Sequence, residues 1–164
     1  MFSIRLKTIT KYLKDKSSLA DVGTDHGYAI IDGFLNYDLK YAYAIDNKKG
    51  PLENAKKNIS NYTFKDNVSF LLSDGLEKLD KEVDVIVFAG MGGLLIIDLI
   101  KKDFHKLFGA RLVIAPNRDS YAVRVFLTNL NYDIIAEEVV YEDGKYYEVI
   151  VFEKAHKKIN YNYL

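Results

Sequence analysis

The sequence predicts an α/β fold built around a mostly parallel β-sheet, and three observations lead to this prediction. Short apolar runs alternate with segments of helical spacing as far as residue 130. Glycine, aspartate or proline stands within two residues of the end of each run, as is typical where strands lead into loops. Two β-rich runs then follow around an Asp-Gly turn. With 164 residues, the chain has the length of one domain.

The apolar runs predict five strands before the final pair. Their alternation with helices implies βαβ crossovers, and therefore a parallel sheet that is covered by helices on both faces. The five strands are expected at Leu19–Val22, Tyr41–Ile45, Val68–Leu72, Val83–Phe88 and Leu112–Ala115.

Helical spacing predicts an amphipathic helix over Phe2–Lys16, with Leu6, Ile9 and Leu13 on one face. A further helix follows the glycine turn after the first strand. Pro51 suits a first helical turn, and Asp119 or Ser120 can cap the last helix. The inner faces of the helices after the second, fourth and fifth strands are expected to hold Leu52, Ala55 and Ile59; Leu94, Ile97 and Ile100; and Ala122, Val125, Phe126 and Leu130.

Asp133–Tyr141 and Lys145–Phe152 predict a hairpin, because Gly144 accepts the positive φ that a tight turn needs. A parallel sheet that ends in an antiparallel pair is unusual for dinucleotide dehydrogenases. It resembles the Rossmann-like class I S-adenosylmethionine-dependent methyltransferases, with seven strands, a C-terminal antiparallel hairpin and helices on both faces. We expect an N-terminal helix packed on the domain (1–17), an S-adenosylmethionine-binding methyltransferase domain (18–154) and a C-terminal tail (155–164).

Composition excludes several classes of protein. The chain is 49% apolar and 28% charged, unlike a disordered chain, and has no cysteine for disulfides, thiolate metal sites or thiol nucleophiles. No apolar run could cross a bilayer and no signal peptide is visible, so we expect a soluble cytoplasmic protein. No pair of ligating residues has metal-binding spacing, so no metal is expected. Net charge is zero, yet residues 1–16 and 40–65 are basic and 66–90 acidic, which leaves room for a basic face.

The segment Asp21–Gly27 forms a glycine turn after the first strand, where ligands bind in open parallel sheets. Gly23 and Gly27 allow the backbone to approach a ligand closely, although packing alone can also require such a turn. Asp25 stands where a pyrophosphate-binding loop more often has glycine. Its carboxylate would repel pyrophosphate and attract a sulfonium or amino group, which favours a cationic cofactor over NAD.

Acidic residues follow the next two strands. Asp46 can accept hydrogen bonds from both hydroxyls of a ribose, as in NAD or S-adenosylmethionine, or it can be a surface turn residue. Asp74 can accept from an adenine amine, cap a following helix, or do both.

Three glycines within Gly90–Gly93 follow the most apolar strand. We interpret them as a floor free of side chains, since no packing argument needs all three. After the fifth strand, Asn117 offers a donor and an acceptor to a base edge, and Arg118 suits a phosphate. His105 and His156 are expected to be solvated.

Together these residues resemble the bacterial tRNA (adenine(22)-N1)-methyltransferases. The matching blocks are Leu19–His26, Val87–Gly93, Ala115–Asn117 and Glu142–Glu148, within a similarity that spans Leu6 to Phe152. Phe88 stands where the family often has Ile, and Gly27–Ala29 differs from the family's Ala-Tyr-Leu-Pro but keeps Tyr28. Relatives carry a further helical, coiled-coil-like region, and this sequence ends where that region would start.

The resemblance implies methylation of N1 of adenine 22 in tRNA, with S-adenosyl-L-methionine as cofactor and S-adenosyl-L-homocysteine as product. Alternatives are methylation of another RNA or a small molecule, a non-catalytic RNA-binding module, and a nicotinamide-dependent oxidoreductase. The absence of an Asn-Pro-Pro-Tyr-type motif argues against methylation of an exocyclic amine. tRNA is the expected partner, with no membrane or metal, and the protein is expected to be a monomer or a weak homodimer.

Candidate site residues fall into three groups. The catalytic candidates are Tyr28, His26, Asn117 and Asp25. The cofactor-binding candidates are Asp21, Gly23, Thr24, Asp25, His26, Gly27, Asp46, Asn47, Ser73, Asp74, Gly75, Leu76, Ala89, Gly90, Met91 and Gly92. The substrate-binding candidates are Gly92, Gly93, Pro116, Asn117, Arg118, Arg5 and Lys7, and Arg124 is a further candidate for a phosphate contact.

Overall fold

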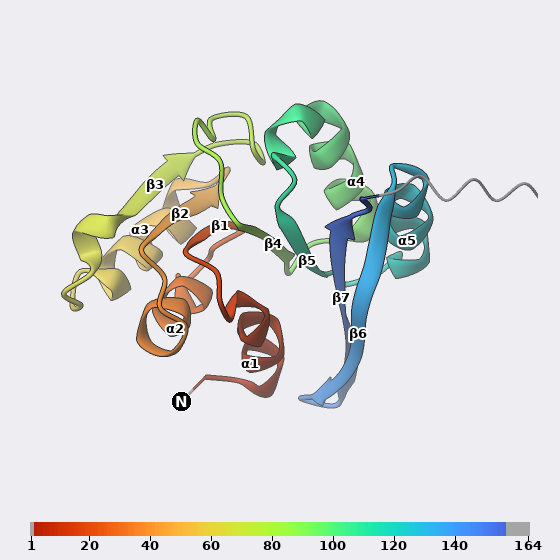
Figure 1. The fold of residues 1–164 in the computed structure, drawn as a ribbon. Helices are drawn as coiled ribbons and strands as arrows, with labels where there is room; N and C mark the ends of the chain where they lie inside the picture. The colour runs from red at the N-terminus through yellow and green to blue at the C-terminus, as the bar shows by residue number, and fades with distance from the viewer. Residues whose placement is uncertain (1, 157–164) are drawn as a thin grey trace, which may run out of the picture.

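A computed structural model describes residues 2–156, so the part of the expected tail from residue 157 onward lies outside the described residues. One seven-stranded sheet runs through the molecule in the order β3-β2-β1-β4-β5-β7-β6 (Figure 1). The α/β prediction, with its mostly parallel sheet and final antiparallel pair, is confirmed. The strands are β1 (Ser18–Val22), β2 (Tyr41–Asp46), β3 (Val68–Leu72), β4 (Val85–Ala89), β5 (Arg111–Ala115), β6 (Tyr132–Glu142) and β7 (Lys145–Lys154).

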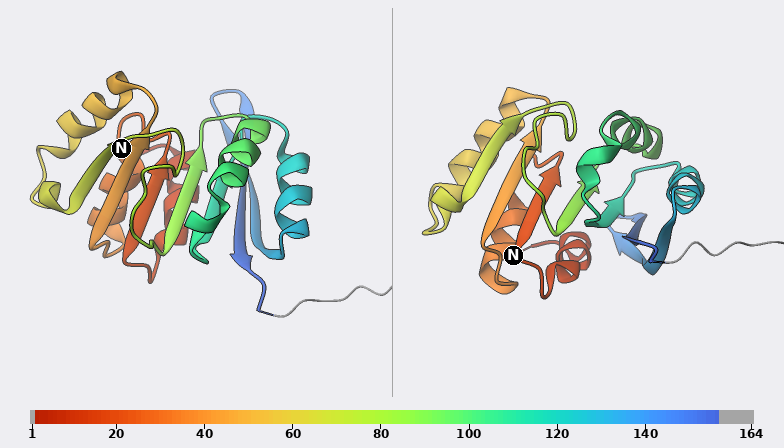
Figure 2. Two further views of the ribbon diagram at one scale, coloured as in Figure 1. Left: turned by 90° about the horizontal axis from the view of Figure 1, so that it is seen from above. Right: turned by 45° about the horizontal axis from the view of Figure 1, so that its top comes forward.

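Two apolar cores lie on opposite faces of the sheet, and each is closed by its own helices (Figures 1 and 2). On one face, side chains from the first three helices pack on alternate strand residues. On the other, α4 and α5 pack on the intervening residues. The helices are α1 (Ile4–Thr10), α2 (Tyr28–Asn36), α3 (Lys49–Ile59), α4 (Gly93–Lys102) and α5 (Ser120–Asn129), with 3-10 turns η1 (Lys11–Leu13), η2 (Lys65–Asn67) and η3 (Phe104–Leu107).

The N-terminal segment buries Ile9 in α1 and Leu13 in η1, as the spacing predicts, but α1 is shorter than the predicted helix. The Ser3 side chain caps its start by accepting from the Leu6 amide at 3.1 Å. Beyond Thr10 the chain tightens into η1 before it enters β1. The helix packs against α2, β6 and β7, which brings its first turn to the carboxyl edge of the sheet.

The inner faces of two later helices differ from the predictions. In α5 the fully buried residues are Val123 and Leu127, whereas Val125 is 40% exposed. The reason is tertiary: the start of α5 is held against Gly93, where Val123 packs closely. In α4, Ile97 and Ile100 are buried as predicted, but Leu94 lies in the first turn and is 57% exposed.

The predicted helix after β3 is absent from the described chain, which forms turns between Ser73 and Asp84. Leu76 and Leu79 are buried in the core from these turns. These two side chains are therefore buried without a helix. Asp74 has no helix to cap at this position, contrary to one of its predicted roles.

The strand order places the topological switch point between β1 and β4, because the chain continues from β1 toward one edge of the sheet and from β4 toward the other. The hairpin reaches further than its neighbour. β5 pairs with β7 from Leu112↔Phe152 to Ile114↔Ile150, so that residues 145–149 of β7 run beyond this pairing at the carboxyl end of β5 (Figure 1).

Candidate functional site

The glycine turn leaves β1 at the switch point. The Gly23 and Thr24 amides donate to the Ile45 carbonyl at 2.8 and 3.1 Å, so the turn is anchored to β2. Gly23 has φ +82°, and a Cβ there would lie 2.9 Å from the Met91 Cε and 3.3 Å from the Ala89 carbonyl. Gly23 is therefore needed for the turn itself and for the close approach of the loop after β4.

Two cavities open at this edge. The first, which we call the β2–β3 cavity, has a volume of about 380 Å³ and is lined by the turn and the loops after β2, β3 and β4. Gly23, Asp46 and Gly90 all line it, so the three strand ends chosen from the sequence meet at one cavity. The cofactor candidates that line it are Gly23, Asp25, Asp46, Asn47, Ser73, Asp74, Gly75, Ala89, Gly90 and Met91.

The second cavity, the α1 cavity, has a volume of about 590 Å³ and lies under the N-terminal helix. It shares Gly23, Asp25, Ala89 and Gly90 with the β2–β3 cavity, so the two meet across the ends of β1 and β4. Its other predicted site residues are Arg5, Asp21, Thr24, His26 and Tyr28.

Asp21 is a buried carboxylate in the wall of the α1 cavity, 5% exposed. Burial raises the pKa of Asp21 to about 6; the charge of Asp46 adds to the shift, and Thr24 opposes it. A buried carboxylate whose charged form is destabilised by desolvation is typical of a functional site, since a cationic ligand would stabilise that charged form.

Replacing Asp21 by asparagine is expected to remove a pH dependence of stability. The folded-state pKa lies above the ordinary value for aspartate, so the folded protein binds the proton more tightly than the unfolded chain. Relative to Asp21→Asn, the wild-type free energy of unfolding should therefore fall by roughly 2 kcal/mol as the pH rises from about 4 to about 6. Urea unfolding of the two proteins across this range measures the difference, and exposed Asp66→Asn should show the same pH dependence as the wild type. Equal pH slopes for the wild type and Asp21→Asn would contradict the assignment.

Three aromatic side chains, Phe2, His26 and Tyr28, lie next to one another at the glycine turn. The rings of His26 and Tyr28 are stacked, with centroids 5.1 Å apart and 19° between planes, and Phe2 lies 6.0 Å from Tyr28. The His26 Nε2 is 3.5 Å from an Asp25 carboxylate oxygen. Tyr28 is 46% exposed, so a planar ligand in the α1 cavity has a ring to stack on.

The glycine floor needs correction, because packing accounts for part of it. A Cβ at Gly93 would lie 2.6 and 2.8 Å from the carbonyl oxygens of Asp119 and Arg118, and one at Gly92 would lie 3.2 Å from the Arg118 Nε. Gly90, with φ +76°, faces open space and both cavities. Gly92 and Gly93 line neither cavity. Gly27 also lies outside both cavities. It makes room for α3, because a Cβ there would lie 3.0 Å from the Ile59 Cδ1.

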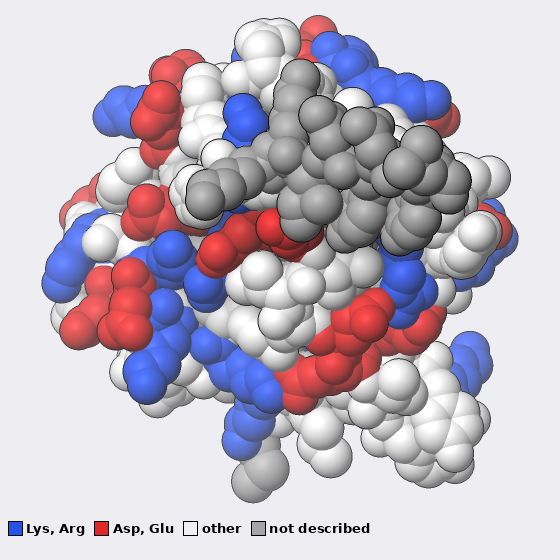
Figure 3. Space-filling view, turned by 45° about the vertical axis from the view of Figure 1, so that its right-hand side comes forward, with Lys and Arg blue, Asp and Glu red and all other residues white. Residues whose placement is uncertain are grey.

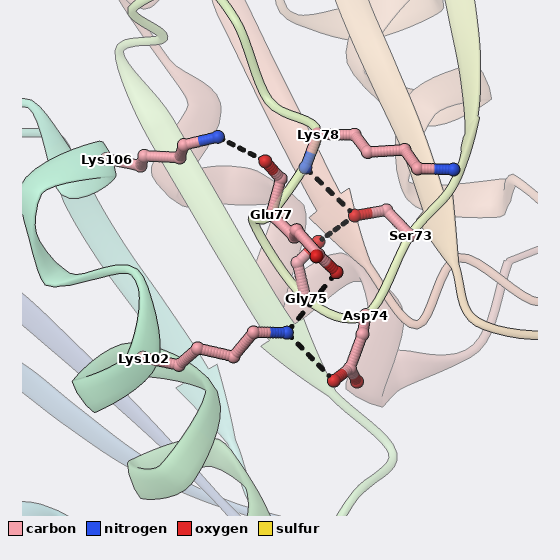
Figure 4. Close-up of polar contacts among 7 residues, drawn as sticks. All are labelled: Ser73, Asp74, Gly75, Glu77, Lys78, Lys102 and Lys106. Atoms are coloured by element: carbon pink, nitrogen blue, oxygen red, sulfur yellow. Dashed lines mark hydrogen bonds and ion pairs between the residues drawn. The ribbon is translucent and has the colours of Figure 1, made fainter.

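The loop after β3 is held to the C-terminal end of α4 (Figure 4). Lys102 Nζ lies 3.0 Å from an Asp74 oxygen and 3.3 Å from a Glu77 oxygen, and Lys106 donates to the Glu77 carbonyl. The Ser73 hydroxyl donates to the Gly75 carbonyl and accepts from the Lys78 amide. Exposed pairs of this kind add little stability, but they fix the Asp74 carboxylate at the rim of the β2–β3 cavity. Leu76 points into the core instead.

Arg5, a substrate-binding candidate, is partly buried and held by several contacts. Its guanidinium lies 4.1 Å from the Tyr147 ring centroid and donates to the Ala115 carbonyl at 3.2 Å, with the Asn117 Oδ1 at 3.5 Å. Partial burial lowers the pKa of Arg5, although Tyr147 and Glu142 oppose this. Arg5 thus forms a wall of the α1 cavity beside Asn117, which is exposed at the end of β5.

The remaining substrate candidates are divided. Lys7 is exposed, the Arg118 side chain is 82% exposed, and Pro116 is buried; all three lie outside both cavities. Arg124 is held by Glu137 at 2.6 Å and Glu148 at 2.9 Å, so its charge is already matched. Acidic and basic side chains are intermingled on the face that is seen when the right-hand side of Figure 1 is turned forward (Figure 3).

Sequence reasoning missed several residues that line the cavities. Phe2, Ser3 and Glu142 line the α1 cavity, and Lys48, Leu95 and Leu99 line the β2–β3 cavity. Glu142 accepts a hydrogen bond from the Arg5 amide at 3.2 Å, across a separation of 137 residues, so no local pattern could have indicated it. His105 and His156 are exposed as predicted.

Within residues 2–156, no helix is long and apolar enough to cross a membrane. Over the same residues, no group of three or more His, Asp or Glu side chains is arranged to hold a metal ion.

Comparisons with known proteins agree on one kind of enzyme. A methyltransferase domain family matches residues 2–150. The tRNA (adenine(22)-N(1))-methyltransferase of Bacillus subtilis is 35% identical over 162 residues, which cover 98% of this chain and 68% of that protein.

Solved structures give the same result. The B. subtilis m1A22 tRNA methyltransferase TrmK superposes with a TM-score of 0.89 at 36% identity, covering 94% of this chain and 67% of that one. A Streptococcus pneumoniae protein in complex with S-adenosyl-L-methionine superposes with a TM-score of 0.90 at 32% identity, covering 98% and 77%. M. capricolum TrmK in complex with S-adenosyl-homocysteine gives 0.87 at 32%, covering 94% and 69%.

Proposed function

Because the chain belongs to the tRNA (adenine(22)-N1)-methyltransferase family, we propose that it transfers a methyl group from S-adenosyl-L-methionine to N1 of adenine 22 in tRNA. The observation that carries the proposal is the meeting of Gly23, Asp46 and Gly90 at one cavity that opens into a second. tRNA as substrate would place the enzyme in the cytoplasm, and we expect it to act as a monomer or a weak homodimer.

The β2–β3 cavity fits an adenosyl group. Its volume falls within the range of about 300–1,000 Å³ that is usual for small-molecule sites. Asp46, at the end of β2, would accept from both ribose hydroxyls, and Asp74 from the adenine amine. Gly23 and Gly90 leave space at the junction of the cavities, where a sulfonium would face Asp21 and Asp25. When bound, S-adenosyl-L-methionine supplies a methyl group that its sulfonium activates for transfer.

The α1 cavity would hold the target base. N1 of adenine is unprotonated at neutral pH, so no strong base is needed to start the reaction. Tyr28, with His26 behind it, would stack on the ring, and Asn117 and Arg5 would contact its edge. Holding N1 in line with the methyl group can contribute roughly 7–11 kcal/mol to the rate. Because N1 faces a partner base in folded tRNA, the target must leave its stack, at a cost of about a few kcal/mol.

Replacing Asn117 by alanine is expected to lower turnover more than cofactor binding. Asn117 lines neither cavity, but its Oδ1 lies 3.5 Å from the guanidinium of Arg5, which lines the α1 cavity. Loss of one positioning hydrogen bond should lower kcat roughly tenfold. Calorimetric binding of S-adenosyl-L-methionine should stay unchanged, as it should in the exposed Asn129→Ala. Equal losses of turnover and cofactor affinity would remove Asn117 from the substrate side.

Binding of tRNA is expected to weaken with salt, because Lys7 and Arg118 are exposed cations near the site and would displace counterions from phosphates. With about two such contacts, a fourfold rise in salt should lower the affinity roughly tenfold. The slope of log affinity against log salt should become shallower in Lys7→Gln/Arg118→Gln, while Arg124→Gln should leave it unchanged. A salt-independent wild-type affinity would contradict these contacts.

The proposal is tested by incubating the protein with labelled S-adenosyl-L-methionine and bacterial tRNA, followed by nucleoside analysis. The expected product is 1-methyladenosine, which should be absent when a transcript carries guanine at position 22. Label in another nucleoside, or in tRNA lacking adenine 22, would redirect the assignment to another RNA site. Thermal stabilisation by NAD and not by S-adenosyl-L-methionine would overturn it.

A further inference from the structure

Two tyrosines stand exposed on one face of the β6–β7 hairpin near its tip. Tyr141 and Tyr146 are directly opposite each other in the strand register. Their ring centroids are 4.9 Å apart with 49° between planes, and the residues remain 59% and 76% exposed. Among the described residues, this pair is the only aromatic contact that either ring makes. Each ring therefore keeps an open face.

The hairpin does not need this exposed pair in order to fold. Its strands are registered from Tyr132↔Lys154 to Glu142↔Lys145, and its inner face is held by Tyr147 under the Arg5 guanidinium. Val140, opposite Tyr147, is buried in the core. A cross-strand tyrosine pair contributes only modestly to the stability of a hairpin. The exposure of two aromatic rings at this position therefore needs another explanation.

The position of the pair connects it to the candidate site. This end of the hairpin runs past the last pairing with β5, at the sheet edge where both cavities open. Glu142, the residue after Tyr141, lines the α1 cavity. Side chains alternate along a strand, so Glu142 faces the cavity and Tyr141 faces outward on the same two-stranded ribbon. The ribbon is thus a wall of the α1 cavity with an aromatic outer surface.

We propose that Tyr141 and Tyr146 form a stacking platform for an unpaired base of the tRNA, next to the nucleotide that enters the α1 cavity. This inference rests on the proposed function, because it assumes an RNA strand at that cavity. Exposed tyrosine rings are the surface on which single-stranded bases stack, whatever their sequence. Everting the target unstacks its neighbours, and the platform would hold one of them.

Removing the platform is expected to weaken tRNA binding without affecting the chemistry. In Tyr141→Val/Tyr146→Val the β-branched residues preserve strand propensity. The Kd for tRNA should rise about tenfold, while the Kd for S-adenosyl-L-methionine and kcat at saturating tRNA stay unchanged. Tyr121→Ala, which removes an equally exposed tyrosine from α5, is the matched control. An unchanged Kd for tRNA in the double variant, or an equal rise in the control, would overturn the proposal.

A fluorescent reporter separates this inference from the proposed function. The chain has no tryptophan, so Tyr146→Trp carries a single indole that can still stack. Its fluorescence should be quenched by tRNA and by a single-stranded oligonucleotide, with or without S-adenosyl-L-methionine. Quenching without any 1-methyladenosine would uphold the platform and refute the proposed reaction. Methylation without quenching would refute the platform alone. A change of the indole fluorescence with protein concentration in the absence of RNA would assign this surface to contact with a second copy of the chain. That result would also refute the stacking platform.

Discussion

Replacement of Asp46 by alanine is expected to weaken binding of S-adenosyl-L-methionine roughly a hundredfold. The carboxylate stands at the end of β2 on the β2–β3 cavity, where it would accept from two ribose hydroxyls. Hydrogen bonds to a charged group contribute about 1.5–3 kcal/mol each, so losing the pair should cost roughly 3 kcal/mol or about two orders of magnitude in affinity. Isothermal calorimetry measures the loss directly.

The control for this change must separate binding from loop folding, because Asp46 also accepts from the Lys48 amide at 3.0 Å. Asp46→Asn keeps an oxygen for that turn but loses the charge, so it should fold normally and bind with intermediate affinity. Asp66→Ala, an exposed aspartate outside both cavities, should bind as tightly as the wild type. If Asp46→Ala bound the cofactor as tightly as the wild type, the ribose would lie elsewhere.

Replacement of Gly93 by alanine is expected to lower the free energy of unfolding by roughly 3 kcal/mol. The new Cβ would stand 2.6 and 2.8 Å from two backbone carbonyl oxygens and 2.9 Å from Val123 Cγ2. None of these is the end of a flexible side chain, so α4 and α5 would have to separate. The Gly93 amide also donates to the Arg118 carbonyl at 2.9 Å, a bond that separation would lengthen. Urea unfolding measures the change.

Gly90→Ala provides the contrast, because a Cβ there meets nothing within 4 Å. Its positive φ alone should cost about 1–2 kcal/mol, less than the clash at Gly93. The added methyl group would stand at the junction of the two cavities, so the affinity for S-adenosyl-L-methionine should fall more than stability does. Equal stability of Gly93→Ala and the wild type would refute the packing explanation of Gly93.

The sequence predicted the strands and the hairpin well, because their signals are local. Buried parallel strands are short apolar runs with turn residues at their ends, and Asp143-Gly144 marks the hairpin turn. The carboxyl ends of parallel strands share one edge, so Asp46 and Gly90 could be placed together without coordinates. The resemblance to the tRNA (adenine(22)-N1)-methyltransferase family is confirmed by the comparisons.

What the sequence could not predict depends on contacts between distant segments. Gly93 was interpreted as part of a ligand floor, but the return of the chain at Arg118 makes it a packing residue. Arg5 was predicted as a substrate-binding residue, but its contact with the Tyr147 ring in the wall of the α1 cavity could not be predicted. Which face of α5 is buried is determined by the packing of Val123 against Gly93, and helical spacing alone does not show that contact.

The central claim is that the carboxyl edge of the sheet holds the methyl donor between β2 and β4, next to the cavity for the base. A crystal structure of the chain with S-adenosyl-L-homocysteine tests it most directly. We expect the ribose hydroxyls within hydrogen-bond distance of Asp46 and the sulfur beside Gly90, pointing toward Tyr28. Ligand density away from Asp46 and Gly90, or a sulfur that points away from the α1 cavity, would contradict the account.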